Sequence, residues 1–438
     1  MSDSYVIGSA YLISMDPAVG DLPAGRVRVD DGTITHIGAE VPLDGATVID
    51  APRSILMPGL IDTHWHLWNT VLRGVIADGP VRGYFPVKRR LARHFTPENS
   101  YDACRMALAE ATASGITTVN NWDHNARSPE DVDAKLRAHR DMGLRTRYSY
   151  GNPDAYDRTR PMDLPDIARV KDELTPDGLL TLGAAVRGPT RTEPDVLRRE
   201  WDTLRELGVP MTMHCGGRRA QTDRYADLTA MYRDGLLGPD LQIVHAVEVD
   251  DAEIELLAET GTHLTLSPLT EYHGMGIPRI GELLDAGIVV SLSIDTCASP
   301  LPADMFSQVA AMLELEKGRR PDGPLTPRRA LEMATIDGAR DLGIDHLTGS
   351  LTVGKRADLI LLDADALNLA PCVDPIRTVA HCAKPHNVRL VMVDGRILKQ
   401  DDRFTRFTPA DVVETARHTV LDLLTRSGWT DFPAPFLF

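Results

Sequence analysis

Paired cysteines and long apolar runs are missing from the sequence. Its five cysteines are odd in number and scattered, and none belongs to a CxxC pair. This usage is typical of a reducing compartment and excludes a disulfide framework. No apolar stretch is long enough to span a bilayer, and residues 1–4 lack the basic start and following apolar run of a signal peptide. We therefore expect a cytoplasmic protein with no membrane partner.

An excess of positive charge is missing as well. The 438 residues carry a formal net charge of -16, which argues against nucleic acid and anionic membranes as partners. The hydrophobic fraction of 43% and the charged fraction of 25% are typical of a globular protein. The length allows one large domain with a smaller one, or two to three ordinary domains.

Strand signals without helical periodicity lie near both ends of the chain. The hairpin signal Asp30-Asp31-Gly32 separates two short apolar runs near the start. Similar β character returns after the middle of the chain, so we expect residues 1–57 and 349–402 to form one small, discontinuous β-sandwich domain. Residues 403–438 follow as a helix and an aromatic tail, and this tail favours a homo-oligomer, either a dimer or a tetramer.

Between these segments, residues 58–348 alternate strand and helix signals. This alternation predicts an α/β fold, a parallel (β/α)8 TIM barrel. A doubly wound open sheet is the alternative, and the lack of a glycine-rich dinucleotide fingerprint after the first strand disfavours it. The strand signals lie near residues 55–64, 116–122, 145–150, 180–187, 209–215, 241–246, 263–267 and 289–295.

Two histidines close the first predicted barrel strand. Side chains alternate faces along a strand, so His64 and His66 point the same way and can direct two imidazoles at one point. That arrangement suits a metal ion, although two unrelated polar residues at a strand end would give the same pattern.

Further polar residues close other strands of the predicted barrel. In a TIM barrel, functional residues lie at the carboxyl ends of the strands. His214 closes the fifth strand, His245 the sixth and Asp295 the eighth. Imidazoles combined with a carboxylate suit Zn²⁺ or Fe²⁺, and such a cation lowers the pKa of bound water toward neutrality.

These residues carry a resemblance to a known family. The stretch from Pro58 to His66, the lone His214, His245 and the stretch from Ser293 to Ser299 resemble the amidohydrolase superfamily over nearly the whole chain. The most similar branch is that of cytosine deaminase and the s-triazine hydrolases. The segment from Gly349 to Leu359 resembles the second sandwich segment of that branch.

The resemblance implies one divalent metal, Zn²⁺ or alternatively Fe²⁺, held by His64, His66, His214 and Asp295. It further implies that His245 polarises the substrate or stabilises the oxyanion and that Asp295 accepts a proton. Binuclear members use a carboxylated lysine on the fourth strand, and residues 179–188 contain none. The expected activity is that of a metal-dependent hydrolase, in which metal-bound hydroxide attacks an sp² carbon. The C–N bond cleaved would belong to a small, heterocyclic molecule, by deamination or by cyclic amide or amidine hydrolysis.

One position departs from the family pattern. Deaminases of this branch carry a proton-shuttling glutamate three residues after the histidine of the fifth strand, where this chain has Gly217. A glycine side chain transfers no protons. Three explanations stay open. Another side chain takes over the proton transfer, with Glu271, Asp123, His124 and His273 as candidates, or the leaving group needs little protonation. The third is a member that does not deaminate: an amide or carbamate hydrolase, or a lyase or isomerase of specialised metabolism.

Several other side chains are candidates for contact with the small-molecule substrate. Each has a structural alternative, such as packing for a tryptophan or an ion pair for an arginine. The candidates are Trp65, Trp68, Asp123, His124, Arg187, Glu271 and His273.

Overall fold

The computed structural model describes residues 4–175, 177–215, 226–299 and 301–429. Its central element is a sheet of eight parallel strands whose order follows the chain. The last strand returns to the first through a parallel bridge between Trp65 and Asp295, so the predicted (β/α)8 barrel is confirmed. The strands are β6 (Leu60–Trp65), β7 (Ile116–Asp123), β8 (Arg145–Gly151), β9 (Leu180–Val186), β10 (Met211–Cys215), β11 (Leu241–His245), β12 (His263–Leu266) and β13 (Val290–Leu292).

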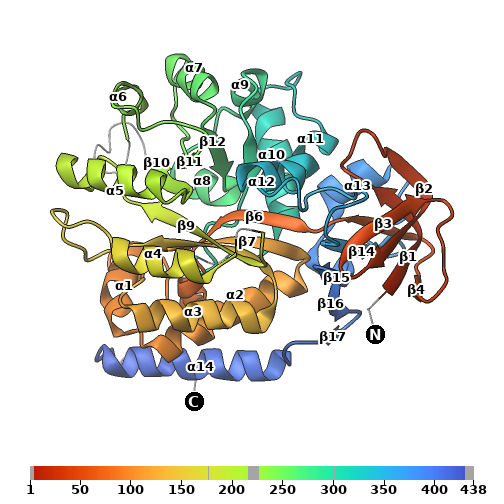
Figure 1. Ribbon diagram of the computed structural model, residues 1–438, viewed down its shortest axis with the longest axis horizontal. Helices are drawn as coiled ribbons and strands as arrows, with labels where there is room; N and C mark the ends of the chain where they lie inside the picture. The colour runs from red at the N-terminus through yellow and green to blue at the C-terminus, as the bar shows by residue number, and fades with distance from the viewer. Residues whose placement is uncertain (1–3, 176, 216–225, 300, 430–438) are drawn as a thin grey trace.

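Helices alternate with these strands and surround them (Figure 1). The sequence patterns did not predict two short elements that lie between β6 and α2. They are η1 (Leu67–Leu72) and α1 (Tyr84–Leu91), with a further turn at η2 (Ala92–His94). The barrel helices are α2 (Pro97–Ala113), α3 (Pro129–Met142), α4 (Leu164–Glu173), α5 (Pro194–Glu206), α6 (Leu228–Arg233), α7 (Asp251–Thr260), α8 (Pro268–Gly274), α9 (Ile280–Asp285), α10 (Met305–Arg319), α11 (Pro327–Met333) and α12 (Ile336–Asp341).

Local sequence signals set the ends of several barrel helices. The Ser128 hydroxyl accepts a hydrogen bond from the Asp131 backbone amide and caps α3, which begins at Pro129. Gly143 ends the same helix with a φ of 76°, a left-handed conformation that costs glycine little. Capping and termination signals of this kind explain why the strand and helix order could be predicted from residue patterns.

A second sheet joins the two ends of the chain. Figure 1 shows the red N-terminal strands and the blue C-terminal strands side by side at one end of the barrel. Their inward apolar residues form a cluster of their own, distinct from the barrel core. The nine strands are β1 (Ser4–Ile13), β2 (Asp21–Asp30), β3 (Thr33–Gly38), β4 (Thr47–Asp50), β5 (Ser54–Pro58), β14 (Leu359–Asp363), β15 (Val388–Val393), β16 (Arg396–Gln400) and β17 (Arg403–Phe404).

A buried ion pair fixes this sheet to the barrel. Arg145 at the start of β8 donates to Asp358 at 2.6 Å, and both side chains are almost fully buried. Asp358 also accepts a hydrogen bond from the backbone amide of Asp394 in the turn between β15 and β16. Two parts of the chain that are far apart in sequence are thereby held against one barrel strand.

The chain then runs back along the barrel. After α13 (Pro375–Cys382) and the strands of the second sheet, α14 (Pro409–Arg426) lies against α2 (Figure 1). No helix among the described residues has the length and apolar character needed to cross a membrane. The aromatic tail that led us to expect a homo-oligomer falls at 430–438, outside the described residues.

Candidate metal centre and active site

The site begins with two imidazoles from one strand. His64 and His66 at the end of β6 both approach Asp295, and their Nε2 atoms lie 3.4 and 3.3 Å from its Oδ1 atom. Their ring centroids are 4.7 Å apart. Trp65 between them packs in the barrel core, as the alternation of a strand requires.

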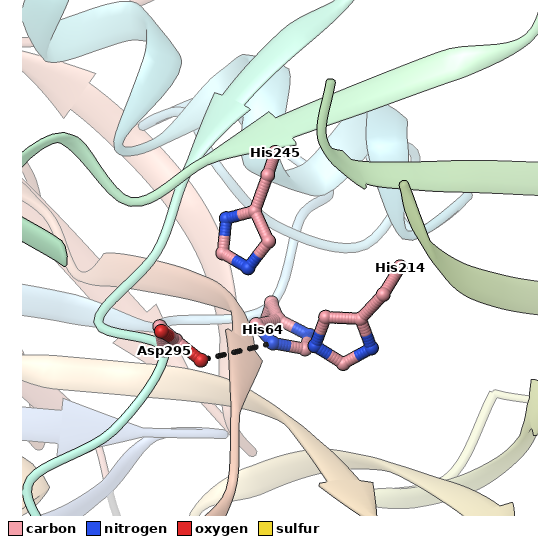
Figure 2. Close-up of side chains that lie close together, drawn as sticks. All are labelled: His64, His214, His245 and Asp295. Atoms are coloured by element: carbon pink, nitrogen blue, oxygen red, sulfur yellow. Dashed lines mark ion pairs between the residues drawn. The ribbon is translucent and has the colours of Figure 1, made fainter. Parts of the chain in front are cut away.

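Two more imidazoles come from neighbouring strands. His214 on β10 lies with its ring 4.7 Å from that of His64, and His245 ends β11 with its ring 5.5 Å from that of His214. Figure 2 shows the side chain of His64 between Asp295 and His214, with the ring of His245 directed toward them from above. One potential ligand atom from each of these four residues lies within 4.8 Å of the others, and His66 adjoins them.

The backbone at this site adopts unusual conformations. His245 and Asp295 have φ angles of 74° and 64°, and Ala246 has 45°. Residues with a Cβ rarely adopt this left-handed region, which costs about 1–3 kcal/mol in the sparsely populated cases. The fold retains these conformations where the chain turns out of β11 and out of the eighth barrel strand, and they help to direct both side chains into the site.

His64 and His214 are held neutral, as metal ligands must be. Burial lowers the pKa of His64 to about 3 and lowers the pKa of His214 well below its ordinary value. Neither ring nitrogen of His64 has a hydrogen-bond partner within the described part of the chain, although both atoms are buried. A buried imidazole without partners costs free energy, and a coordinated cation would satisfy its lone pair. The residues present therefore fit a divalent metal.

A neighbouring carbonyl orients the second ligand candidate. The Nδ1 atom of His66 lies 3.0 Å from the backbone oxygen of Trp122, which can only accept a hydrogen bond. Nδ1 consequently carries the proton, and the Nε2 atom directed at Asp295 keeps its lone pair. Burial raises the pKa of Asp295, but the neighbouring imidazoles of His64, His66 and His245 outweigh this effect and hold that pKa well below its usual value.

A cavity of about 360 Å³ opens onto these groups. Its volume suits a small molecule, since ligand pockets are commonly about 300–1,000 Å³. His124, Arg187 and His273, three of the substrate contacts expected from the sequence, line it. The lining further includes Tyr84, Phe85, Lys88, Trp122, Asp154, Thr190, Arg191, Thr270, Met275, Thr296 and Ser299.

An ion-pair bridge forms part of the cavity wall. Asp154 accepts from Lys88 at 2.8 Å and from Arg187 at 3.2 Å, one cation on each carboxylate oxygen. Lys88 also lies 3.1 Å from Nε2 of His124, whose ring packs 4.2 Å from that of His66. Burial and the charge of Lys88 lower the pKa of His124 well below its usual value. The bridge brings two cations into the cavity that contains the histidine cluster.

The other expected substrate contacts lie behind the cavity wall. The Asp123 carboxylate accepts from Lys135 at 2.7 Å and from Tyr148, and all three side chains are buried. Trp68 donates its indole hydrogen to Nδ1 of His124 at 3.5 Å. Glu271 contacts His245, and Trp65 packs in the core. These four residues support lining residues or the barrel interior.

Sequence patterns alone missed several residues of the wall. Tyr84 and Lys88 belong to α1, whose eight residues are too few to show a clear helical period. Asp154 lies in the loop after β8 and acquires its role only through partners from other segments. The family position at Gly217 lies outside the described residues.

Comparison with known proteins establishes the family. The model of the Amidohydrolase family matches residues 55–398, which is most of the chain, so the protein belongs to the amidohydrolase family. It is accordingly a hydrolase of carbon–nitrogen bonds other than peptide bonds, as the sequence predicted.

Named relatives cover almost the full length. The chain is 30% identical to 5'-deoxyadenosine deaminase of Methanosarcina mazei, over 96% of this chain and 98% of the relative. It is also 30% identical to 5-methylthioadenosine/S-adenosylhomocysteine deaminase of Nitratidesulfovibrio vulgaris strain Miyazaki F, with the same coverage of both chains.

Solved structures share the fold over nearly the whole chain. An adenosine deaminase from Xanthomonas campestris with bound zinc superposes with a TM-score of 0.87 and 25% identity, covering 97% of this chain and 99% of that one. The atrazine chlorohydrolase of Arthrobacter aurescens TC1, in a variant complexed with zinc and atraton, gives a TM-score of 0.84 and 20% identity. That match covers 96% of this chain and 100% of the other, and it supports the fold alone.

Proposed function

We propose that this hydrolase deaminates a small amino-substituted heterocycle of the adenosine type, with one divalent metal held by His64, His66, His214 and Asp295. These four side chains converge beside one cavity, which His66, His214 and Asp295 line, and this convergence is the observation that carries the proposal. The adenosine-type deaminases among the relatives support the substrate class. Zinc is the favoured metal, because imidazole and carboxylate ligands suit it and the adenosine deaminase of similar fold binds it.

The cation would supply Lewis-acid activation of a water molecule near neutral pH. Asp295 is ionised beside that position and can accept a proton from the attacking water. His245 reaches the same point from β11 and can interact with the substrate at the carbon under attack. The aromatic side chains of Tyr84, Phe85 and Trp122 wall the cavity and can pack against a planar ring.

A second candidate reaction follows from Gly217. Without a carboxylate at that position, the chain could hydrolyse an amide or carbamate, or catalyse a lyase or isomerase step on the same scaffold. The cytoplasmic location and the homo-oligomer expected from the sequence stay predictions.

Ammonia release tests the proposal. The zinc-loaded and iron-loaded enzymes would each be incubated with adenosine, 5'-deoxyadenosine, 5'-methylthioadenosine and S-adenosylhomocysteine in ¹⁸O-labelled water. We expect ammonia from at least one compound and one solvent oxygen in its product. Deamination that is undiminished in the Asp295→Ala variant would contradict the assigned site. Product without solvent oxygen would instead favour the lyase or isomerase alternative.

A further inference from the structure

We propose that Glu271 is the positioning residue of His245, and that this pair handles protons at the cavity, which Gly217 cannot do. The inference rests on the proposed function, because His245 is the residue that meets the substrate there. Oε1 of Glu271 lies 3.1 Å from Nδ1 of His245. The exposed fractions of the two side chains are 0% and 2%, so water does not compete for this contact.

The fold holds Glu271 rigidly in this place. Its Oε1 atom accepts a second hydrogen bond, at 2.8 Å, from the backbone amide of Ser267. Its own carbonyl oxygen accepts from the amides of Met275 and Gly276 at 2.7 and 2.9 Å. Both ends of the residue are therefore tied to the segment that leaves β12, and the carboxylate has little freedom to turn away from His245.

These contacts determine which nitrogen of His245 carries the hydrogen. Oε1 of Glu271 accepts the hydrogen of the Ser267 amide, so it is also the acceptor toward His245, and Nδ1 donates to it. Nε2 is then the nitrogen left for the cavity, and Figure 2 shows the ring projecting toward His64 and Asp295. Ring orientation and tautomer are both set before any substrate enters.

This arrangement allows a balanced proton transfer. As the oxygen of the attacking water bonds to the substrate carbon, one of its protons passes to Asp295 and from there to the adjoining ring nitrogen of the substrate, and Nε2 of His245 takes the other proton. Nε2 then gives that proton to the leaving nitrogen as the C–N bond breaks, and the ring returns to its starting state. The hydrogen on Nδ1 stays bonded to that nitrogen and hydrogen-bonded to Glu271 throughout. The carboxylate offsets the positive charge on the ring between the two transfers.

A purely structural glutamate would not explain one further feature. Oε2 of Glu271 is buried and has no hydrogen-bond partner among the residues that the structure describes. A buried carboxylate oxygen without a partner destabilises the fold. A negative charge at this place would, however, stabilise the ring of His245 when it becomes positive during turnover. The charge of Glu271, beyond its shape, is therefore the property to test.

Two substitutions separate charge from shape. Glu271→Gln keeps an oxygen that can accept from Nδ1 but removes the charge, and Glu271→Ala removes both. Tyr272→Phe is the matched control, since Tyr272 is the next residue of α8 and its side chain is 58% exposed. Each zinc-loaded protein would be compared for zinc content, for kcat and KM with 5'-deoxyadenosine, and for histidine ¹⁵N NMR signals, with His245 assigned through a His245→Gln variant.

The NMR signals need no turnover, so they test the pair even where no compound is deaminated. We expect His245 to be protonated at Nδ1 in the wild type and in Glu271→Gln, and to lose this preference in Glu271→Ala. We expect kcat to fall about 100-fold in Glu271→Gln and further in Glu271→Ala, with KM and zinc content unchanged. The kcat–pH profile of Glu271→Gln should shift, while Tyr272→Phe should match the wild type.

Two results would overturn the inference. One is a His245 signal that is the same in Glu271→Ala as in the wild type. The other is a Glu271→Gln variant that deaminates 5'-deoxyadenosine at the wild-type rate. Absence of deamination together with the expected NMR signals would count against the proposed function and would leave the Glu271–His245 pair standing.

Discussion

The backbone amide of Asp295 donates a hydrogen bond to the carbonyl oxygen of His64 at 2.9 Å. The amide of His66 in turn donates to the carbonyl oxygen of Asp295 at 2.8 Å. The backbone contacts that close the barrel between its first and last strands therefore also link three candidate ligands, His64, His66 and Asp295. Closure of the barrel and assembly of the metal centre depend on the same few backbone contacts.

The first prediction concerns metal content. Asp295→Ala should lower bound zinc well below one ion per chain, because it removes the one anionic ligand of the proposed site. Elemental analysis by mass spectrometry of dialysed protein measures this. Asp402→Ala, at an exposed turn, is the control and should keep its zinc. Full zinc occupancy in Asp295→Ala would contradict the ligand assignment.

The second prediction concerns the cationic wall of the cavity. Lys88→Met keeps the length of the side chain but removes the charge that Asp154 and His124 contact. Hydrogen bonds to charged groups contribute about 1.5–3 kcal/mol, so kcat/KM should fall about 10- to 100-fold with zinc content unchanged. Lys317→Met, on the exposed side of α10, provides the comparison. Equal kcat/KM values for the two variants would place Lys88 outside the substrate site.

The third prediction concerns stability. The ammonium of Lys135 is fully buried and donates to Asp123 at 2.7 Å and to Asp131 at 2.9 Å. Lys135→Met leaves two buried carboxylates without their cation, so the free energy of unfolding should fall by about 3–5 kcal/mol. Urea denaturation measures it, with Lys317→Met again as the control. A loss under about 1 kcal/mol would show that the carboxylates find other partners.

The fourth prediction concerns pH. Burial raises the pKa of Glu200 on α5 from 4.5 to about 7 in the folded protein. Between these values the folded state binds more protons than the unfolded state, so the free energy of unfolding falls as pH rises through this window. The Glu200→Gln variant lacks this pH-dependent contribution to the free energy of unfolding, because glutamine does not titrate. The stability of the wild type relative to Glu200→Gln should therefore fall by about 3 kcal/mol between pH 4.5 and pH 8.

Urea denaturation of both proteins at several pH values checks this slope. The Glu200 carboxyl accepts a hydrogen bond from the Met162 amide at 2.7 Å, and glutamine can accept the same bond, so the fold should be preserved. A stability difference that does not change with pH would contradict the raised pKa.

Much of the fold was predictable because its signals are local. The short apolar run of each barrel strand, the capping serine at Ser128 and the left-handed Gly143 all act within a few residues. The alternation of side chains along a strand places His64 and His66 on one face. It also explains why Asp123 points away from the cavity that its neighbours Trp122 and His124 line.

Other parts of the site depend on distant contacts, which a residue pattern does not encode. Lys88 contacts Asp154 and His124, and the three residues belong to three separate segments of the chain. Glu271 contacts His245 only because the segment after β12 folds back over the end of β11. Such pairs become visible when the barrel is assembled, since each partner alone is an ordinary charged residue.

The central claim is that these strands converge on a single cation, and a crystal structure of the zinc-loaded enzyme, with data collected at the zinc absorption edge, tests it most directly. The account predicts one anomalous peak about 2.0–2.2 Å from imidazole nitrogens of His64, His66 and His214 and from a carboxylate oxygen of Asp295. A peak elsewhere in the molecule, or none at full zinc saturation, would contradict it.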